Sequence, residues 1–291
     1  MTVVIDFLSD WKRYLLSSLA SQGYRVSHDE TLDAISYKFF NVTRRRIQAI
    51  QRTVHESSAL SCPDDVMAGY QALQAKFVAG DDVTPHLSKS ILKADHEDPL
   101  FNHWGIHHFH LGINPDSSGF TDRTGPLLFA FITPSDAYFI NVLPHGAWSD
   151  QKLVHILHRN WPTVIAAFRL QGVRGLARPH ANQSIAKLRK AGISTFVQVE
   201  PGVVYAPMGG GYSSAGTSIQ ATMDSDKYIM LVQHMETHVH DNMDIFLKKI
   251  SERKRTPANP PAFSLRITDE CFFAVETSSQ VAFRLTPHAL D

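Results

Sequence analysis

Two apolar runs separated by a short turn limit the fold of this chain more than any other feature. Residues 127–132 read Leu-Leu-Phe-Ala-Phe-Ile, a continuous apolar stretch typical of a strand that is buried on both faces. Residues 134–136, Pro-Ser-Asp, favour a turn, and residues 137–143 have the pattern of a second strand, so the pair predicts a β-hairpin. A further strand is expected over 106–111. Three successive strands indicate an antiparallel sheet with helices on one face.

The whole chain predicts an α+β fold in three parts. Residues 1–60 form a helical N-terminal segment, in which apolar side chains recur every four positions from Phe7 to Leu19. Residues 61–172 form the central α+β unit that carries the histidines. Residues 173–291 form a second α+β unit with a hairpin, a long helix and three closing strands.

The cysteine content and the apolar runs limit the class of protein. Cys62 and Cys271 are the only cysteines in the 291 residues, too few for a disulfide scaffold or a four-cysteine zinc site. A reducing cytoplasm is therefore the expected compartment. No apolar run reaches the roughly 18 residues that a membrane helix requires. The first six residues have neither a basic flank nor an apolar signal core, so no membrane insertion and no secretion are expected.

Charge is unevenly distributed although the formal net charge is zero. Residues 61–150 contain 11 Asp/Glu and 4 Lys/Arg, whereas residues 151–291 contain 16 Lys/Arg and 11 Asp/Glu. A polyanionic partner would therefore be held by the flanks of the histidine-rich segment rather than by that segment itself.

A basic cluster near residue 45 has two interpretations. Thr43 is placed to cap a third helix that carries Arg44, Arg45 and Arg46. Two helices joined by a short turn, the second of them basic, are compatible with a nucleic-acid-binding helix-turn-helix. The alternative is a small helical bundle with a solvated basic face.

Four histidines lie within eight residues of one stretch, 102–112, which reads Asn-His-Trp-Gly-Ile-His-His-Phe-His-Leu-Gly. Alternate side chains of a strand point to opposite faces, so His108 and His110 share one face and His107 lies on the other. We expect His107 to pack inward and His108 and His110 to form an exposed pair.

A candidate catalytic site follows from this pair. His145 ends the third predicted strand, so a sheet in chain order would gather it at one end with His108 and His110. Histidine titrates near neutrality, and two of them can serve as base and acid in one reaction. Arg123 precedes the second strand and could neutralise a phosphate, and Asp82 could orient an imidazole. The alternative is a histidine-rich surface without chemistry.

The same three histidines also allow a metal site. His108 and His110 on one strand, with His145 on a neighbour, would give zinc three nitrogen ligands and leave a fourth position for water.

Two other motifs are weaker. His234 and His238 lie four apart on a predicted helix, but the acid between them is displaced by one position from the zinc-protease pattern. The loop Gly209-Gly210-Gly211 precedes a helix and lacks the lysine of a Walker motif, so a mobile loop or a helix cap is the better interpretation.

Residues 70–148 resemble the RelE-type ribonuclease toxins. The resemblance is carried by the order of helices and strands, by an acid–Pro–Leu–Ser type of loop at 82–88, and by the motifs Trp104-Gly105-Ile106-His107-His108, Arg123, Leu127-Leu128-Phe129-Ala130-Phe131, Tyr138-Phe139-Ile140-Asn141-Val142 and His145-Gly146-Ala147-Trp148.

The resemblance implies metal-independent cleavage of RNA, often of messenger RNA on the ribosome, by attack of the 2′-hydroxyl on the adjacent phosphate. It implies that His145 acts as acid or base, that Arg123 stabilises the phosphate and that Asp82 takes the place of the family's acid. His107 and His108 stand where the family has arginines. A toxin of this type would have an antitoxin protein as a partner. A metal-dependent hydrolase and a non-enzymatic interaction or nucleic-acid-binding protein are the alternatives.

Overall fold

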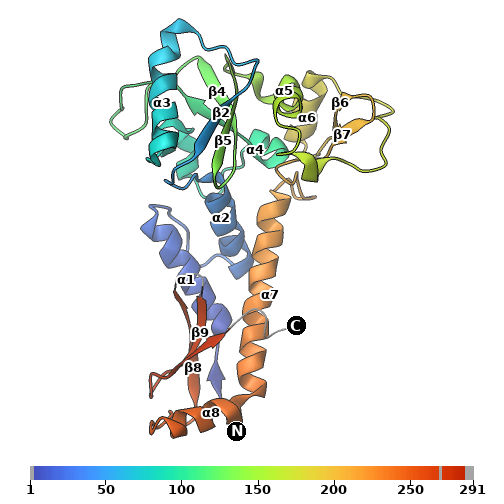
Figure 1. Ribbon diagram of the computed structural model, residues 1–291. Helices are drawn as coiled ribbons and strands as arrows, with labels where there is room; N and C mark the ends of the chain where they lie inside the picture. The colour runs from blue at the N-terminus through green and yellow to red at the C-terminus, as the bar shows by residue number, and fades with distance from the viewer. Residues whose placement is uncertain (1–2, 269–270, 286–291) are drawn as a thin grey trace. The chain divides into compact units, whose positions relative to one another are not determined.

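The computed structural model describes residues 3–268 and 271–285, which form two compact units (Figure 1). Unit 1 combines the described residues of 1–40 and 223–291, and unit 2 is the continuous segment 41–222. The chain passes from one unit to the other within α2 (Leu32–Arg45) and again within α7 (Ile219–Asp241). This division differs from the three sequential parts expected from the sequence, because residues from both ends of the chain share one sheet.

Unit 2 is built on a four-stranded mixed sheet in the order β2-β5-β4-β3. Its strands are β2 (Thr53–Glu56), β3 (Ile106–His110), β4 (Pro126–Ile132) and β5 (Asp136–Pro144). The expected meander of β3, β4 and β5 is antiparallel, and the α+β class is confirmed. β2, which pairs in parallel with β5, was not expected from the sequence.

Helices cover both faces of this sheet, so the expectation of helices on one face is wrong. One apolar core joins Phe109 and Phe139 to Leu73 and Phe77 of α3 (Met67–Ala79). The core on the other face joins Phe129 to three further helices. Those helices are α4 (Pro99–Trp104), α5 (Lys152–Asn160) and α6 (Asn182–Lys190), and Figure 1 shows α3 and α5 on opposite sides of the strands. The unbroken apolar character of β4 fits burial on two faces.

The remaining elements of unit 2 are short. They are the hairpin β6 (Val197–Glu200) and β7 (Val203–Tyr205) and the 3₁₀ helices η1 (Asp64–Val66), η2 (Thr84–His86), η3 (Lys89–Leu92), η4 (Ala147–Ser149) and η5 (Ala166–Phe168).

Unit 1 contains a second four-stranded sheet, in the order β1-β8-β9-β10. Its elements are β1 (Val4–Ile5), α1 (Phe7–Ser21), α8 (Met243–Glu252), β8 (Ala262–Thr268), β9 (Cys271–Glu276) and β10 (Ala282–Leu285), with parts of α2 and α7. The three closing strands expected from the sequence are all present. Trp11 of α1 stacks on Tyr228 of α7 with ring centroids 5.9 Å apart, which ties the first helix of the chain to the last long one.

Candidate functional site

The sheet register gathers the predicted histidines at one end of the sheet. His110 pairs with Leu127, and Leu127 pairs with Leu143, two residues before His145. The backbone N–H of His145 donates to the carbonyl of Gly125 (2.7 Å), which holds the end of β5 beside the start of β4. The register therefore brings His108, His110 and His145 to the same end of the sheet.

Burial, however, divides the histidines of β3. His107 is 9% exposed and packs inward as expected, with its ring 4.5 Å from that of Phe101. His110 is only 3% exposed, and the side chain of His108 is 14% exposed. The expectation of an exposed pair is wrong, because α4, α5 and α6 cover the second face of the sheet.

His108 lies beside a carboxylate. Its Nδ1 is 3.8 Å from Oδ2 of Asp98, and this buried nitrogen has no hydrogen-bond partner among the described residues. Burial lowers the pKa of His108, and Asp98 opposes that shift. The imidazole of His108 is therefore neutral at neutral pH, with a carboxylate positioned to favour hydrogen on Nδ1 and to leave the Nε2 lone pair free.

Asp98 is fixed by the local fold. Its Oδ1 accepts the backbone N–H groups of Leu100 and Phe101, both at 3.0 Å, which makes it the N-cap of α4. Pro99 occupies the first helical position, where it loses no hydrogen bond. Gly105 ends the helix at φ 66° and leads directly into β3, so one short helix connects Asp98 to the histidine strand.

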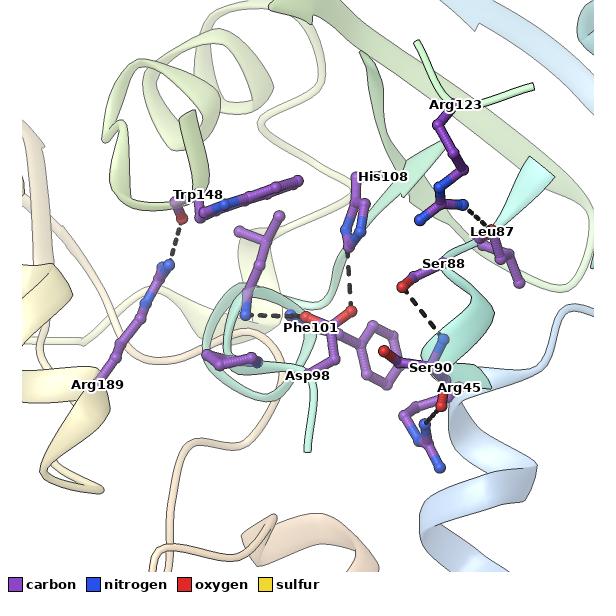
Figure 2. A network of polar contacts seen from close by, with 12 residues as sticks. Arg45, Leu87, Ser88, Ser90, Asp98, Phe101, His108, Arg123, Trp148 and Arg189 are labelled. Carbon is purple, nitrogen blue, oxygen red and sulfur yellow. Dashed lines mark hydrogen bonds and ion pairs between the residues drawn. The ribbon is translucent and has the colours of Figure 1, made fainter. Parts of the chain in front are cut away.

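A cavity of about 320 Å³ opens beside His108. Its surface is mostly apolar, with polar and charged groups among the lining residues, which are Ser88, Ser90, His96, Asp98, Pro99, Leu100, His108, Trp148, Ser149, Ala186, Arg189 and Lys190. Figure 2 shows His108 between Trp148 and Arg123, with Asp98 below it and Ser88 to one side. Of the predicted catalytic residues, only His108 lines this cavity.

The two other predicted histidines lie outside the lining. Nδ1 of His110 accepts the backbone N–H of Thr124 at 3.2 Å, and burial lowers the pKa of His110 to about 3. His145 is exposed, and its ring lies 5.0 Å from Trp148, whose other contact is His108 at 4.5 Å. His108 and His145 thus contact the same indole.

Arg123 and Asp82 have different surroundings. Arg123 donates to the carbonyl of Leu87 at 3.1 Å, and its charge lowers the pKa of both His108 and His110, so it belongs to the cluster. Asp82 accepts the backbone N–H of Thr84 at 2.8 Å. Its charge acts on His86, whose Nδ1 donates to the carbonyl of His110. No described contact joins Asp82 to His108, so an orienting effect on that imidazole belongs to Asp98 instead.

Arg189 is a member of the site that the sequence analysis did not identify. It is 5% exposed, and its guanidinium carbon lies 4.1 Å from the ring centroid of Trp104. Its Nε donates to Nδ1 of His103 at 2.8 Å, and its Nη1 donates to the carbonyl of Trp148. Because Nδ1 of His103 accepts this bond, Nε2 carries the hydrogen and donates to the carbonyl of Thr195 at 2.8 Å. Burial lowers the pKa of His103 to about 3, which keeps the ring an acceptor.

The arginines expected to bind nucleic acid are engaged within unit 2. The third helix capped by Thr43 does not form, because α2 continues to Arg45. Arg44 donates to the carbonyl of Gly209 at 3.0 Å and lies 5.2 Å from the Phe101 ring centroid. Arg45 is 4% exposed and donates to several carbonyls, including that of Lys93 at 2.9 Å, so it does not belong to a solvated basic face. Arg46 is half-buried.

The alternative metal sites are not supported by the geometry. Across residues 3–268 and 271–285, no group of three or more His, Cys, Asp or Glu side chains is arranged to hold a metal ion. The alternative zinc site at His108, His110 and His145 is not among such groups. On α7, the acid between His234 and His238 is Glu236, which accepts the backbone N–H of Phe7 at 2.7 Å.

The glycine-rich loop is a packing element. The N–H groups of Gly209 and Gly211 donate to the carbonyls of His103 (3.1 Å) and Asn102 (2.8 Å) at the end of α4. These donors are therefore used inside the fold, and the loop is a helix cap rather than a phosphate cradle.

Comparison with family models, with curated proteins and with solved structures found no match. No helix in the described part of the chain is both long and apolar enough to cross a lipid bilayer.

Asp98 and Arg189 were missed for different reasons. Asp98-Pro99 is a helix-start signal, and an acid at that position could have been recognised as an N-cap next to the histidine strand. Arg189 lies 81 residues beyond His108 (189 − 108) on a short basic helix, and no local pattern marks it as buried.

Proposed function

We propose that the cavity beside β3 is the active site of a metal-independent ribonuclease. The observation that carries the proposal is that a neutral imidazole, His108, and a buried guanidinium, Arg189, line one cavity, and that Nη2 of Arg189 has no hydrogen-bond partner among the described residues. The first is suited to accept a proton and the second to hold an anion. A phosphodiester requires both.

The proposed reaction begins with proton transfer to His108. Its Nε2 takes the proton from a ribose 2′-hydroxyl, and the oxygen attacks the adjacent phosphorus. As the new oxygen–phosphorus bond forms, the bond from phosphorus to the 5′-oxygen breaks. His145, which contacts the same indole of Trp148, donates a proton to that leaving oxygen. The products are a 2′,3′-cyclic phosphate and a free 5′-hydroxyl.

Charge around His108 supports these assignments. Arg123 lies close enough to lower the pKa of His108, which keeps the imidazole in its basic form. The same guanidinium would stabilise negative charge that develops on the phosphate. Asp98 would stabilise the imidazolium that forms when His108 accepts the proton.

The test is cleavage of a single-stranded RNA in the presence of EDTA. We expect the wild type to cleave and His108→Ala and His145→Ala to lose about 10²-fold or more, since positioned acids and bases contribute about 10²–10⁴-fold. His234→Ala, at an exposed position on α7, is the matched control and should keep full activity. Absence of cleavage by the wild type, or equal cleavage by both site variants, would refute the proposal.

The proposed setting is a cytoplasmic toxin or defence protein that acts on messenger RNA at the ribosome and is restrained by an antitoxin. Its support is the resemblance of residues 70–148 and the free state of Cys62 and Cys271, which suits a reducing compartment. Induced expression of the wild type should arrest growth, and His108→Ala should not. Equal growth with both genes would argue against this setting.

A further inference from the structure

Arg189 is a buried cation without a carboxylate partner of its own. Among the described residues, no Asp or Glu oxygen lies within 4 Å of its guanidinium, and its Nη2 has no hydrogen-bond partner. Burial lowers the pKa of Arg189 to about 10, so the group stays charged at neutral pH. A buried charge without a counter-ion is costly, and stacking on Trp104 offsets only part of that cost.

The cavity that Arg189 lines has an excess of positive charge. Arg189 and Lys190 provide two cations, and Asp98 provides one carboxylate, which already caps α4 and faces His108. Burial lowers the pKa of His96, which leaves that ring neutral. One negative charge on a ligand would balance the lining.

The other lining groups favour an oxyanion with several acceptor oxygens. Ser88, Ser90 and Ser149 are among the lining residues, and a serine hydroxyl is able to donate a hydrogen bond. A phosphate ester presents enough oxygens to use an arginine and hydroxyl donors together. A volume of about 320 Å³ lies at the lower end of the range for small-molecule pockets, which suits one nucleotide and not a duplex.

We infer that Arg189 anchors a phosphate-binding subsite in this cavity and that the cavity takes the phosphate ester of a single nucleotide unit. The phosphate subsite itself is argued from the cavity alone. Only the statement that the bound phosphate belongs to RNA rests on the proposed function. His103 is the positioning residue, because its neutral Nδ1 holds Nε of Arg189 and fixes the plane of the guanidinium.

The test measures binding without turnover. Titration of the full chain with inorganic phosphate and with adenosine 5′-monophosphate, followed by calorimetry, should give saturable binding to the wild type, tighter for the nucleotide. Arg189→Gln should weaken binding at least tenfold. Because Arg189→Gln could unfold the unit, Ala186→Leu is the second variant. Ala186 lines the same cavity one turn earlier on α6, so a larger side chain there blocks the space and leaves the contacts of Arg189 in place.

Measuring nucleotide binding and RNA cleavage on the same wild-type protein separates this inference from the proposed function. Nucleotide binding by a wild type that does not cleave RNA would leave the subsite standing and refute the ribonuclease. The inference is overturned if the wild type binds neither ligand, or if folded Ala186→Leu binds nucleotide as tightly as the wild type.

Discussion

Asp98 lies within ion-pair distance of His108, although its charge also acts on His107. Burial lowers the pKa of His107, His108 and His110 alike, but of these three only His108 has a carboxylate oxygen within 4 Å. Asp98 therefore raises the basicity of the ring that lines the cavity. An imidazole without such a partner would be buried and neutral, and it would gain nothing from accepting a proton.

Asp98→Asn tests this dependence. Asparagine is as good an N-cap as aspartate, so α4 should remain folded. Loss of the charge removes the influence that raises the pKa of His108, and that pKa should fall further. We expect cleavage to drop about tenfold at neutral pH and the acid limb of the kcat/KM profile to move to lower pH. Asp95→Asn, at an exposed position nearby, is the control. An unchanged acid limb would contradict the pairing.

At the scale of the residue, the local pattern predicted on which face of β3 each histidine lies, but it did not predict how deeply each one is buried. The alternation of side chains placed His107 inward and His108 and His110 on the opposite face, and the register agrees. The pattern could not show that the opposite face is also covered, because α5 and α6 come from residues 152–190. Which histidine would reach a cavity therefore depended on packing that is remote in sequence.

At the scale of the element, α4 organises the site. Its N-cap is Asp98, its last turn carries His103 and Trp104, and the loop at Gly209 closes over its C-terminal end. A Cβ on Gly209 would lie 1.9 Å from the carbonyl oxygen of Phe101, so this close approach requires glycine. The glycine-rich loop serves the site by holding this helix.

Gly209→Ala should therefore destabilise the protein without altering any group in the cavity. The methyl group meets backbone atoms that cannot rotate away, and overpacking of this kind costs about 1–3 kcal/mol. Urea unfolding monitored by circular dichroism measures the loss. Gly125→Ala is the matched control, because its Cβ would meet nothing within 4 Å. Equal free energies of unfolding for the two variants would contradict this prediction, because they would show that the loop can move to accommodate the methyl group.

Strands and helices with strong periodicity were predictable from the sequence. The short strand β2 and the residue at which α2 ends were not. The hairpin of β4 and β5 follows from two apolar runs and a Pro-Ser-Asp turn. The four-residue β2 carries Thr-Val-His-Glu, which alternates too briefly to separate from a loop. The third helix expected after Thr43 was wrong because α2 continues through that residue, and a capping residue inside a longer helix gives a false start signal.

At the scale of the whole molecule, buried histidines make stability depend on pH. In the folded state the pKa is about 3 for His103 and His110 and about 4 for His107, against about 6.5 in an unfolded chain. The unfolded state therefore binds protons first as the pH falls. Above about pH 6.5 these histidines are neutral in both states and do not change the free energy of unfolding. As the pH drops from there towards 4, the free energy of unfolding decreases.

The expected slope is up to about 1.4 kcal/mol per pH unit for each of these histidines. Urea unfolding at pH 7.5, 6.0 and 5.0 measures this slope. In a His107→Gln variant the free energy of unfolding should fall less steeply with pH, by the amount that the binding of about one proton contributes. A free energy of unfolding that stays level from pH 7.5 to 5.0 would contradict the neutral, buried state of these side chains.

The discontinuity of unit 1 has a consequence for synthesis. Val4 of β1 pairs with Ala262 of β8, so the first strand and α1 cannot complete their sheet until the last quarter of the chain has been made. Residues 41–222 are continuous and can fold as soon as they emerge. We therefore expect the cavity to exist on the nascent chain while Phe7 and Trp11, both buried in the finished protein, are still exposed. The interval between the two events is when this protein would most need a chaperone, and when the cavity beside His108 would already be formed.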